Sequence, residues 1–346
     1  GIIVLLKELS EAFGPPGQED EVRDLIREKI APHVDRIWTD TMGNLYAEKK
    51  GRDAAGPRIM LAAHMDEVAL MITRIDREGF LHFKSLGGID QRVLIAKPVV
   101  IGRQRVPGVI GAKAVHLLEP EERERALSLR ELFIDIGARD KEEAEKLVAI
   151  GEGAVFQSRF SSIGGNRVRG KALDNRAGCS ALVELLQYDY PVNLTAVFTV
   201  QEEVGLRGAR IASYNLKPDL ALVMETTTAG DVPEAKSHQM STRLGKGPAL
   251  TIMDRTLIAA PDLLKALEET AQRLDKPYQW KQTATGGTDG GAIHLTGAGI
   301  PTAVVAIPCR YLHSPASVID LADYQHLIEL IHGFLTHAPG RRTGQK

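Results

Sequence analysis

The stretch Ile59-Met60-Leu61-Ala62-Ala63-His64-Met65-Asp66 decides the fold class. Its five consecutive apolar residues are typical of a strand that is buried on both faces, as in a parallel sheet. The run ends in a histidine and an aspartate, and parallel sheets carry their sites at the carboxyl ends of their strands. We therefore expect a functional site at the edge of the sheet where His64 lies.

The segments on either side of this strand alternate between helix and strand patterns. Two helices with apolar residues at helical spacing come first, followed by a hairpin that turns at Gly43-Asn44. The alternation resumes later, with strands expected at 194–200, 220–224 and 302–306 and helices at 175–188, 206–214, 261–274 and 319–335. This pattern predicts an α/β fold with a mainly parallel sheet covered by helices on both faces.

Between these parts, from about residue 67 to residue 165, the pattern changes to short apolar runs separated by glycines. The runs 70–75, 80–83, 99–102, 109–111 and 132–136 are predicted strands, and one helix is expected at 141–150. We therefore predict a small β-rich domain, residues 67–165, inserted into a catalytic domain of residues 1–66 and 166–346. The polar end segment 339–346 is expected to fray.

Composition excludes several classes of protein. The 346 residues contain 43 Lys and Arg and 45 Asp and Glu, and the two signs are interleaved. Nucleic acid and anionic membranes are therefore poor partners for this chain. The longest uncharged stretch, 290–309, is interrupted by glycines and Pro301, which disfavours a membrane span. Two cysteines, Cys179 and Cys309, are too few for a disulfide framework, so we expect reduced, buried thiols and a cytoplasmic protein.

Side chains that bind metals follow several predicted strands or lie at the start of a later segment. They are His64, Asp66, Asp174, Glu202, Glu203, Glu225 and His313. Imidazole and carboxylate ligands without thiolate suit Zn²⁺, or else Co²⁺ or Mn²⁺, and a carboxylate can bridge two ions. The sequence thus predicts a site for two divalent ions, although Asp174 taken alone is more typical of a helix cap.

The adjacent pair Glu202-Glu203 suggests a division of roles. Neighbouring residues at a strand end point to opposite sides, so one carboxylate can bind metal while the other stays free. The free one would accept the proton of an attacking water and pass it to a leaving amine.

Five strings in this order resemble the M42 metallo-aminopeptidases: 63–67, 173–178, 201–205, 287–289 and 310–314. That family includes the tetrahedral, TET-type enzymes, and relatives have also been labelled deblocking, glutamyl or lysyl aminopeptidases and endoglucanases. The resemblance implies a di-zinc exopeptidase-like fold with an inserted PDZ-like dimerisation domain. It also implies a homo-oligomer in which dimers assemble into a hollow tetrahedral dodecamer.

The same resemblance assigns roles to single residues. It implies that His64, Asp174 and Glu225 hold one ion and that Asp174, Glu203 and His313 hold the other. Glu202 then matches the general base, and Asp66 matches the carboxylate that orients His64. The family usually has Asp at the position of Glu225, and the extra methylene lengthens this side chain by about 1.5 Å.

The sequence therefore predicts a di-metal aminopeptidase that removes N-terminal residues from short peptides with a free N-terminus. One alternative is another hydrolase on this scaffold, such as a carboxypeptidase, a deacylase or an endoglucanase. A glycosidase would need two carboxylates and no histidine ligands. The other alternative is a shell subunit with a degenerate site. For Asp254 we weigh an acidic wall of a pocket for basic residues against a solvated charge at a strand end, and prefer the latter.

Overall fold

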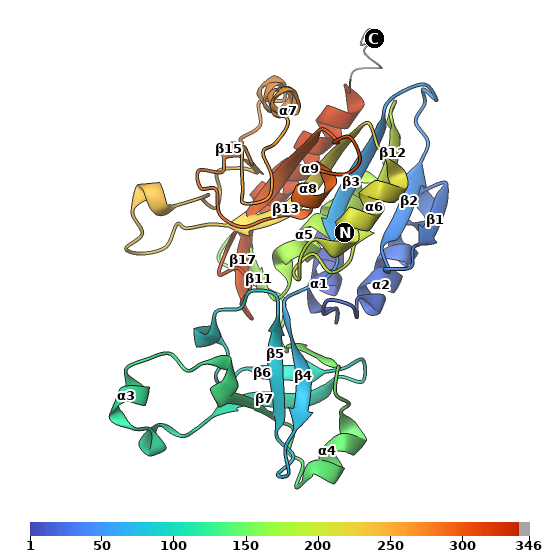
Figure 1. Ribbon diagram of the computed structural model, residues 1–346. Coiled ribbons are helices and arrows are strands. Elements are labelled where there is room, and N and C mark those ends of the chain that lie inside the picture. The colour runs from blue at the N-terminus through green and yellow to red at the C-terminus, as the bar shows by residue number, and fades with distance from the viewer. Residues whose placement is uncertain (339–346) are drawn as a thin grey trace.

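The computed structural model describes residues 1–338, so the predicted fraying of segment 339–346 lies outside the described residues. The chain forms two bodies, an eleven-stranded sheet layered by helices and a closed six-stranded barrel (Figure 1). In Figure 1 the barrel lies below one end of the sheet, and the chain passes between the two bodies near β4.

The sheet has the strand order β1-β2-β12-β3-β13-β16-β17-β11-β10. Its strands are β1 (Arg36–Thr39), β2 (Leu45–Lys49), β3 (Arg58–His64), β10 (Ser161–Ile163), β11 (Arg167–Gly170), β12 (Asn193–Thr199), β13 (Leu220–Thr228), β16 (Thr302–Arg310) and β17 (Ser317–Asp320). Two short strands, β14 (Ala249–Leu250) and β15 (Gln279–Trp280), lie off this path, where β14 pairs with β15 and with β16.

The prediction of a mainly parallel sheet is wrong for the outer strands. The central strands β12, β3, β13 and β16 are parallel, whereas the pairs β1–β2, β2–β12, β16–β17, β17–β11 and β11–β10 are antiparallel. The connections β1–β2 and β16–β17 are only a few residues long, too short for the crossover that parallel neighbours require. The sheet is therefore mixed, with a parallel centre.

Helices cover both faces of the sheet, as predicted. On one face α5 (Leu173–Leu185) packs against β3 and β13, flanked by α1 (Ile2–Glu11), α2 (Asp20–Ile30) and α9 (Leu321–Thr336). On the other face lie α6 (Arg207–Leu216) and α8 (Asp289–Ile293), while α7 (Pro261–Arg273) packs against α9. The last helix begins later than expected, because Ile319 belongs to β17 and Asp320 caps α9 by accepting a hydrogen bond from the Ala322 N–H.

The barrel is built from residues 69–156 in the strand order β4-β5-β8-β7-β6-β9. Its strands are β4 (Ala69–Ile75), β5 (Leu81–Leu86), β6 (Pro98–Ile101), β7 (Val106–Ala112), β8 (Leu132–Asp135) and β9 (Gly153–Phe156). The first five were predicted, whereas β9, with the short apolar run 154–156, was missed. Helix α4 (Lys141–Leu147) and the short α3 (Pro120–Arg123) complete this body, which has its own hydrophobic core.

Short 3₁₀ helices lie in the connections of the described part of the chain: η1 (Ala31–His33), η2 (Gln91–Val93), η3 (Val115–Leu117), η4 (Leu129–Glu131) and η5 (Ser237–Gln239). Cys179 and Cys309 are both free and buried, as predicted. Within residues 1–338, no helix has the length and apolar character needed to cross a membrane.

The two bodies meet beside the first two helices. Phe13 forms a small apolar cluster with Ala69, Val100 and Val155 of the barrel. Gln18 donates a hydrogen bond to the Gly151 carbonyl and accepts one from the Gly153 N–H. These contacts hold the barrel next to the edge of the sheet where β3 and β12 end.

Candidate metal centre

Two of the predicted ligands come from neighbouring parallel strands. His64 is the last residue of β3, and the ladder pairs Ala62 with Val223, so His64 and Glu225 stand two residues further along and share one face. The His64 Nε2 and Glu225 Oε1 atoms are 3.2 Å apart. Glu225 lies inside β13 and does not follow it, because the strand extends to Thr228 and not to residue 224 as expected.

Asp174 lies at the start of α5 but does not cap it. The helical dihedrals are interrupted at Asp174 and Asn175, and it is Asn175 Oδ1 that accepts a hydrogen bond from the Gly178 N–H where the regular helix resumes. Asp174 instead lies between two imidazoles, with Oδ1 3.2 Å from His64 Nε2 and Oδ2 2.9 Å from His313 Nε2. The helix-cap alternative for this residue is therefore wrong.

Ligand atoms of the predicted set converge into overlapping groups. One group is His64, Asp174 and Glu225, another is Asp174, Glu203 and His313, and within each group the ligand atoms lie within 4.8 Å of one another. Asp174 is common to both. These are the two triplets that the family resemblance implied. A third group, His64 with Glu202 and Glu203, places Glu202 beside them.

Buried atoms without hydrogen bonds mark the same place. His64 Nε2, Asp174 Oδ1, Glu203 Oε1 and Glu225 Oε2 are buried and lack a hydrogen-bond partner among residues 1–338. Leaving a buried polar atom unsatisfied costs about 1–3 kcal/mol, and more for a charged group. Four such atoms facing one another are accounted for by divalent cations, so the donor set fits metal ions.

The electrostatics of the centre lead to the same conclusion. Burial raises the pKa of Glu225 to about 8, against the opposing effect of His64. Burial likewise raises the pKa of Glu202 well above its usual range. Burial alone would lower the pKa of His313, but hydrogen bonds to carboxylates, Asp174 first, raise it to about 11. A centre this rich in buried carboxylates favours any positive charge, whether protons or metal ions.

Asp66 holds the turn that presents the two glutamates. Its Oδ1 accepts a hydrogen bond from the Glu202 N–H at 2.9 Å, and its Oδ2 accepts one from the Glu203 N–H at 3.0 Å. His64 Nδ1 is 3.0 Å from the main-chain oxygen of Asp66 and 3.4 Å from Oδ1. Asp66 therefore contacts His64 chiefly through its backbone, and its carboxylate fixes Glu202 and Glu203, a contact that the sequence did not predict.

Sequence reasoning missed Asp289 as a member of the centre. This fully buried residue begins α8, and its Oδ2 accepts a hydrogen bond from Thr199 Oγ1 at 2.5 Å. Burial raises its pKa to about 6, and its charge acts on both Glu202 and Glu225. The string 287–289 contained the residue, but no strand or helix pattern gave it a position.

A cleft of about 670 Å³ opens over the centre. Residues 226–228 of β13 and the loop 285–288 line it, as does Gly88 from the loop that follows β5 of the barrel. The neighbouring Gly87 has φ +90°, and a Cβ atom there would stand 2.9 Å from Val68 and 3.2 Å from Glu203 Cβ. The barrel therefore approaches the centre through a glycine turn, which the division into segments did not predict.

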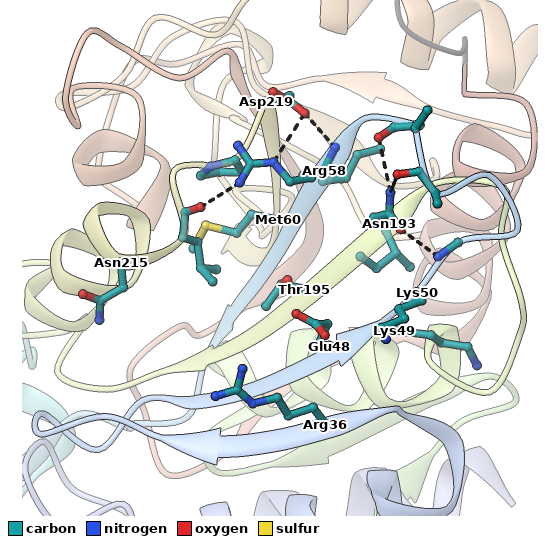
Figure 2. Close-up of a pocket in the computed structure, with 18 of the residues that line it drawn as sticks. Arg36, Glu48, Lys49, Lys50, Arg58, Met60, Asn193, Thr195, Asn215 and Asp219 are labelled. Carbon is teal, nitrogen blue, oxygen red and sulfur yellow. Dashed lines mark hydrogen bonds and ion pairs between the residues drawn. The ribbon is translucent and has the colours of Figure 1, made fainter.

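A second cavity, of about 810 Å³, lies at the opposite edge of the sheet, where β3 and β12 begin (Figure 2). Three of its charged side chains, Arg58, Asp219 and Lys49, have local partners. Arg58 makes an ion pair with Asp219 and donates a hydrogen bond to the Lys217 carbonyl, and Lys49 donates one to the Leu186 carbonyl. The predicted ligands lie at the other edge, so this cavity is separate from the candidate centre.

Comparison with known proteins agrees with the geometry. The family profile described as M42 glutamyl aminopeptidase matches residues 43–330. The chain belongs to the M42 aminopeptidase family. This confirms the resemblance drawn from the five strings, and it makes the M42 chain a hydrolase of peptide bonds.

Three relatives span nearly the whole M42 chain. The lysyl aminopeptidase of Pyrococcus furiosus is 32% identical and covers 96% of each chain. The structure of a TET aminopeptidase from a marine-sediment Thaumarchaeota archaeon has a TM-score of 0.94 at 39% identity, covering 97% of this chain and 96% of the other. The TET1 peptidase of Pyrococcus horikoshii, which can assemble into a tetrahedron or a large octahedral shell, has a TM-score of 0.86 at 33% identity, covering 97% and 100%.

Proposed function

We propose that this M42 protein is a metal-dependent aminopeptidase that removes N-terminal residues from short peptides. The observation that carries the proposal is Asp174, a single carboxylate shared by two groups of ligand atoms, with Glu202 beside them. His64, Asp174 and Glu225 would hold one divalent ion, and Asp174, Glu203 and His313 a second, with Zn²⁺ first and Co²⁺ or Mn²⁺ as alternatives. When bound, such ions polarise a carbonyl and lower the pKa of water.

The residues around the ions would carry the proton transfers. Glu202 accepts the proton of the attacking water and returns it to the nitrogen of the leaving peptide. The buried carboxylate of Asp66 keeps the Glu202 and Glu203 backbone in place through two hydrogen bonds. The carboxylate-rich edge of the cleft would bind the positively charged α-amino group of the substrate, which selects peptides with a free N-terminus.

For the architecture, we propose that residues 67–165 form an inserted, PDZ-like dimerisation domain. The remainder, residues 1–66 and 166–346, would form a catalytic domain of the di-zinc exopeptidase type. The separate core of the barrel supports this division, and exposed apolar side chains on this body support an interface: Val109, Val115, Leu117, Leu147 and Ile150. The shell formed by the TET1 relative supports assembly of dimers into a tetrahedral dodecamer. Light scattering that finds only monomers would contradict this assembly.

Chelation is expected to abolish cleavage of unblocked aminoacyl-p-nitroanilides, and added Zn²⁺ or Co²⁺ is expected to restore it. The reason is that the chelator removes the divalent cations that would lower the pKa of the attacking water. The readouts are the rate of nitroaniline release and the metal content of each sample. The melting temperature should also rise when metal is returned, since metal binds the folded chain.

N-blocked substrates provide the control for this experiment. Equal cleavage of blocked and unblocked substrates would favour a deacylase or an endopeptidase over an aminopeptidase. Chelator-resistant hydrolysis of a β-glucan would favour the endoglucanase alternative. Absence of cleavage with either metal would leave the shell-subunit alternative.

A further inference from the structure

Two cationic side chains line the cleft apart from the proposed ligands. The carboxylates in its lining, Asp174, Glu202, Glu203 and Glu225, all belong to the proposed centre. The lining also contains Lys281 and Arg255, which contact none of these carboxylates at ion-pair distance. Lys281 and Arg255 are therefore the positive charges of the lining that lie outside the proposed centre.

Lys281 is held in place by its backbone and left with spare donors. It directly follows β15, and its N–H donates to the Leu250 carbonyl at 3.0 Å. Its Nζ donates to the Thr285 carbonyl at 2.7 Å, which uses one of the three ammonium hydrogens. Burial lowers the pKa of Lys281, while the charges of Asp254 and Glu225 raise it, which places the ammonium within electrostatic range of the centre.

Arg255 approaches the cleft from a neighbouring turn. Its backbone N–H donates to the Gly286 carbonyl at 2.9 Å, which ties this turn to the 285–288 loop. Its side chain is exposed, and among residues 1–338 it forms no ion pair. A guanidinium left free in this way presents a planar pair of donors, which suits a carboxylate.

Asp254, which we considered as the acidic wall of a pocket for basic residues, has a structural role instead. Asp254 Oδ1 accepts hydrogen bonds from the Thr256 N–H, the Thr256 hydroxyl and the Leu257 N–H. Asp254 is only 5% exposed and does not line the cleft. Asp254 is therefore a buried turn cap, so the solvated charge that we preferred from the sequence is wrong. The alternative, in which Asp254 forms an acidic wall of the cleft, is wrong as well.

We propose that Lys281 and Arg255 form the subsite for the first side chain of the substrate and select peptides that begin with Glu or Asp. This inference rests on the aminopeptidase function proposed above. A substrate carboxylate would accept charge-assisted hydrogen bonds from the spare donors of both residues. A substrate that begins with Lys or Arg would meet like charge in a half-buried cleft. Membership of the family does not fix this preference, because its relatives include one named a glutamyl and one named a lysyl aminopeptidase.

The test compares kcat/KM for Glu-, Gln-, Ala-, Leu- and Lys-p-nitroanilide on the metal-loaded full chain. Glu and Gln have nearly the same shape and differ in charge, so their ratio isolates the effect of the cations. We expect Glu to exceed Gln by about 10- to 100-fold, in line with a charged hydrogen-bonding pair. In Lys281→Met this ratio should fall at least about tenfold, mainly through KM for Glu, while Ala cleavage changes by less than about twofold.

Two further variants sharpen the result. Arg255→Gln should lower the Glu-to-Gln ratio in the same direction, and Lys281→Glu should shift preference toward Lys. The matched control is Lys265→Met on the exposed surface of α7, where the lysine lies outside the cleft and, within residues 1–338, pairs only with Glu269. This control should leave every ratio unchanged.

The possible outcomes distinguish a failure of the proposed subsite from a failure of the proposed aminopeptidase function. Active enzyme that prefers Leu or Lys, or a Glu-to-Gln ratio unaltered in Lys281→Met, would overturn the subsite and leave the aminopeptidase intact. No cleavage of any unblocked substrate with Zn²⁺ or Co²⁺ would overturn the proposed function, and the subsite with it. Equal loss of Ala and Glu cleavage in Lys281→Met would show a general effect on the cleft and would also contradict selective recognition.

Discussion

Replacing Glu202 with Gln is expected to reduce kcat by about 10²- to 10⁴-fold while both metal ions stay bound. The amide keeps the size of the carboxylate and its backbone contact with Asp66, but it cannot accept the proton of the attacking water. Glu202 is also absent from the two ligand groups that share Asp174. The measurement is kcat on the fastest aminoacyl-p-nitroanilide, together with metal content per chain.

Glu203→Gln is the matched comparison, because it changes the adjacent carboxylate in the same way. Glu203 belongs to the group with Asp174 and His313, so its replacement should lower metal content as well as activity. If Glu202→Gln also loses metal, Glu202 is acting as a ligand within the group that it forms with His64. A kcat close to that of the unaltered enzyme would exclude Glu202 as the general base.

Replacing Glu67 with Gln is expected to destabilise the fold by about 3–5 kcal/mol, because it leaves two buried cations without their anion. Lys171 Nζ lies 2.7 Å from Glu67 Oε1, and an Arg176 guanidinium nitrogen lies 2.6 Å from Oε2. All three residues are at most 3% exposed. Urea unfolding at fixed metal and protein concentration measures the change, since metal binding and assembly would otherwise shift it.

The control for Glu67 is an exposed ion pair of the same kind. Glu8 and Lys29 lie 3.4 Å apart with side chains about 40% exposed, so Glu8→Gln should cost at most about 1 kcal/mol. If Glu67→Gln is no more costly than Glu8→Gln, the buried cluster does not stabilise the protein as its geometry implies. The cluster also includes main-chain carbonyls of α1, and of Ala12 just after it, that accept hydrogen bonds from Arg176.

The sequence predicted the parallel centre of the sheet well, since its strands are apolar runs buried on both faces. It placed the end of β13 too early because residues 226–228 are threonines, which are polar by composition yet suit strands because they are β-branched. The short strands β10 and β11 were missed for a different reason. Their residues are largely polar and partly exposed, so no apolar period marks them.

For the candidate centre, the sequence indicated residues that follow an apolar run and gave no signal for contacts between distant segments. His64 and the pair Glu202-Glu203 follow apolar runs, which is a local signal. Asp289, Lys281 and the Glu67 cluster have no such signal, because each gains its role from segments more than 20 residues away that only packing brings together. The family motifs contain the proposed ligands, but they do not include Lys281 and Arg255 in the lining of the cleft.

The glycine turn beside Glu203 limits which barrels could replace the barrel of this protein. Gly87 leaves no room for a side chain between Val68 and Glu203, and Gly88 is part of the wall of the cleft. A chimaera that receives the barrel of another chain must therefore match the turn at these two positions as well as the outer surface of the barrel. The barrel is therefore not an interchangeable module, because replacing it also changes the wall of the cleft over the candidate metal centre.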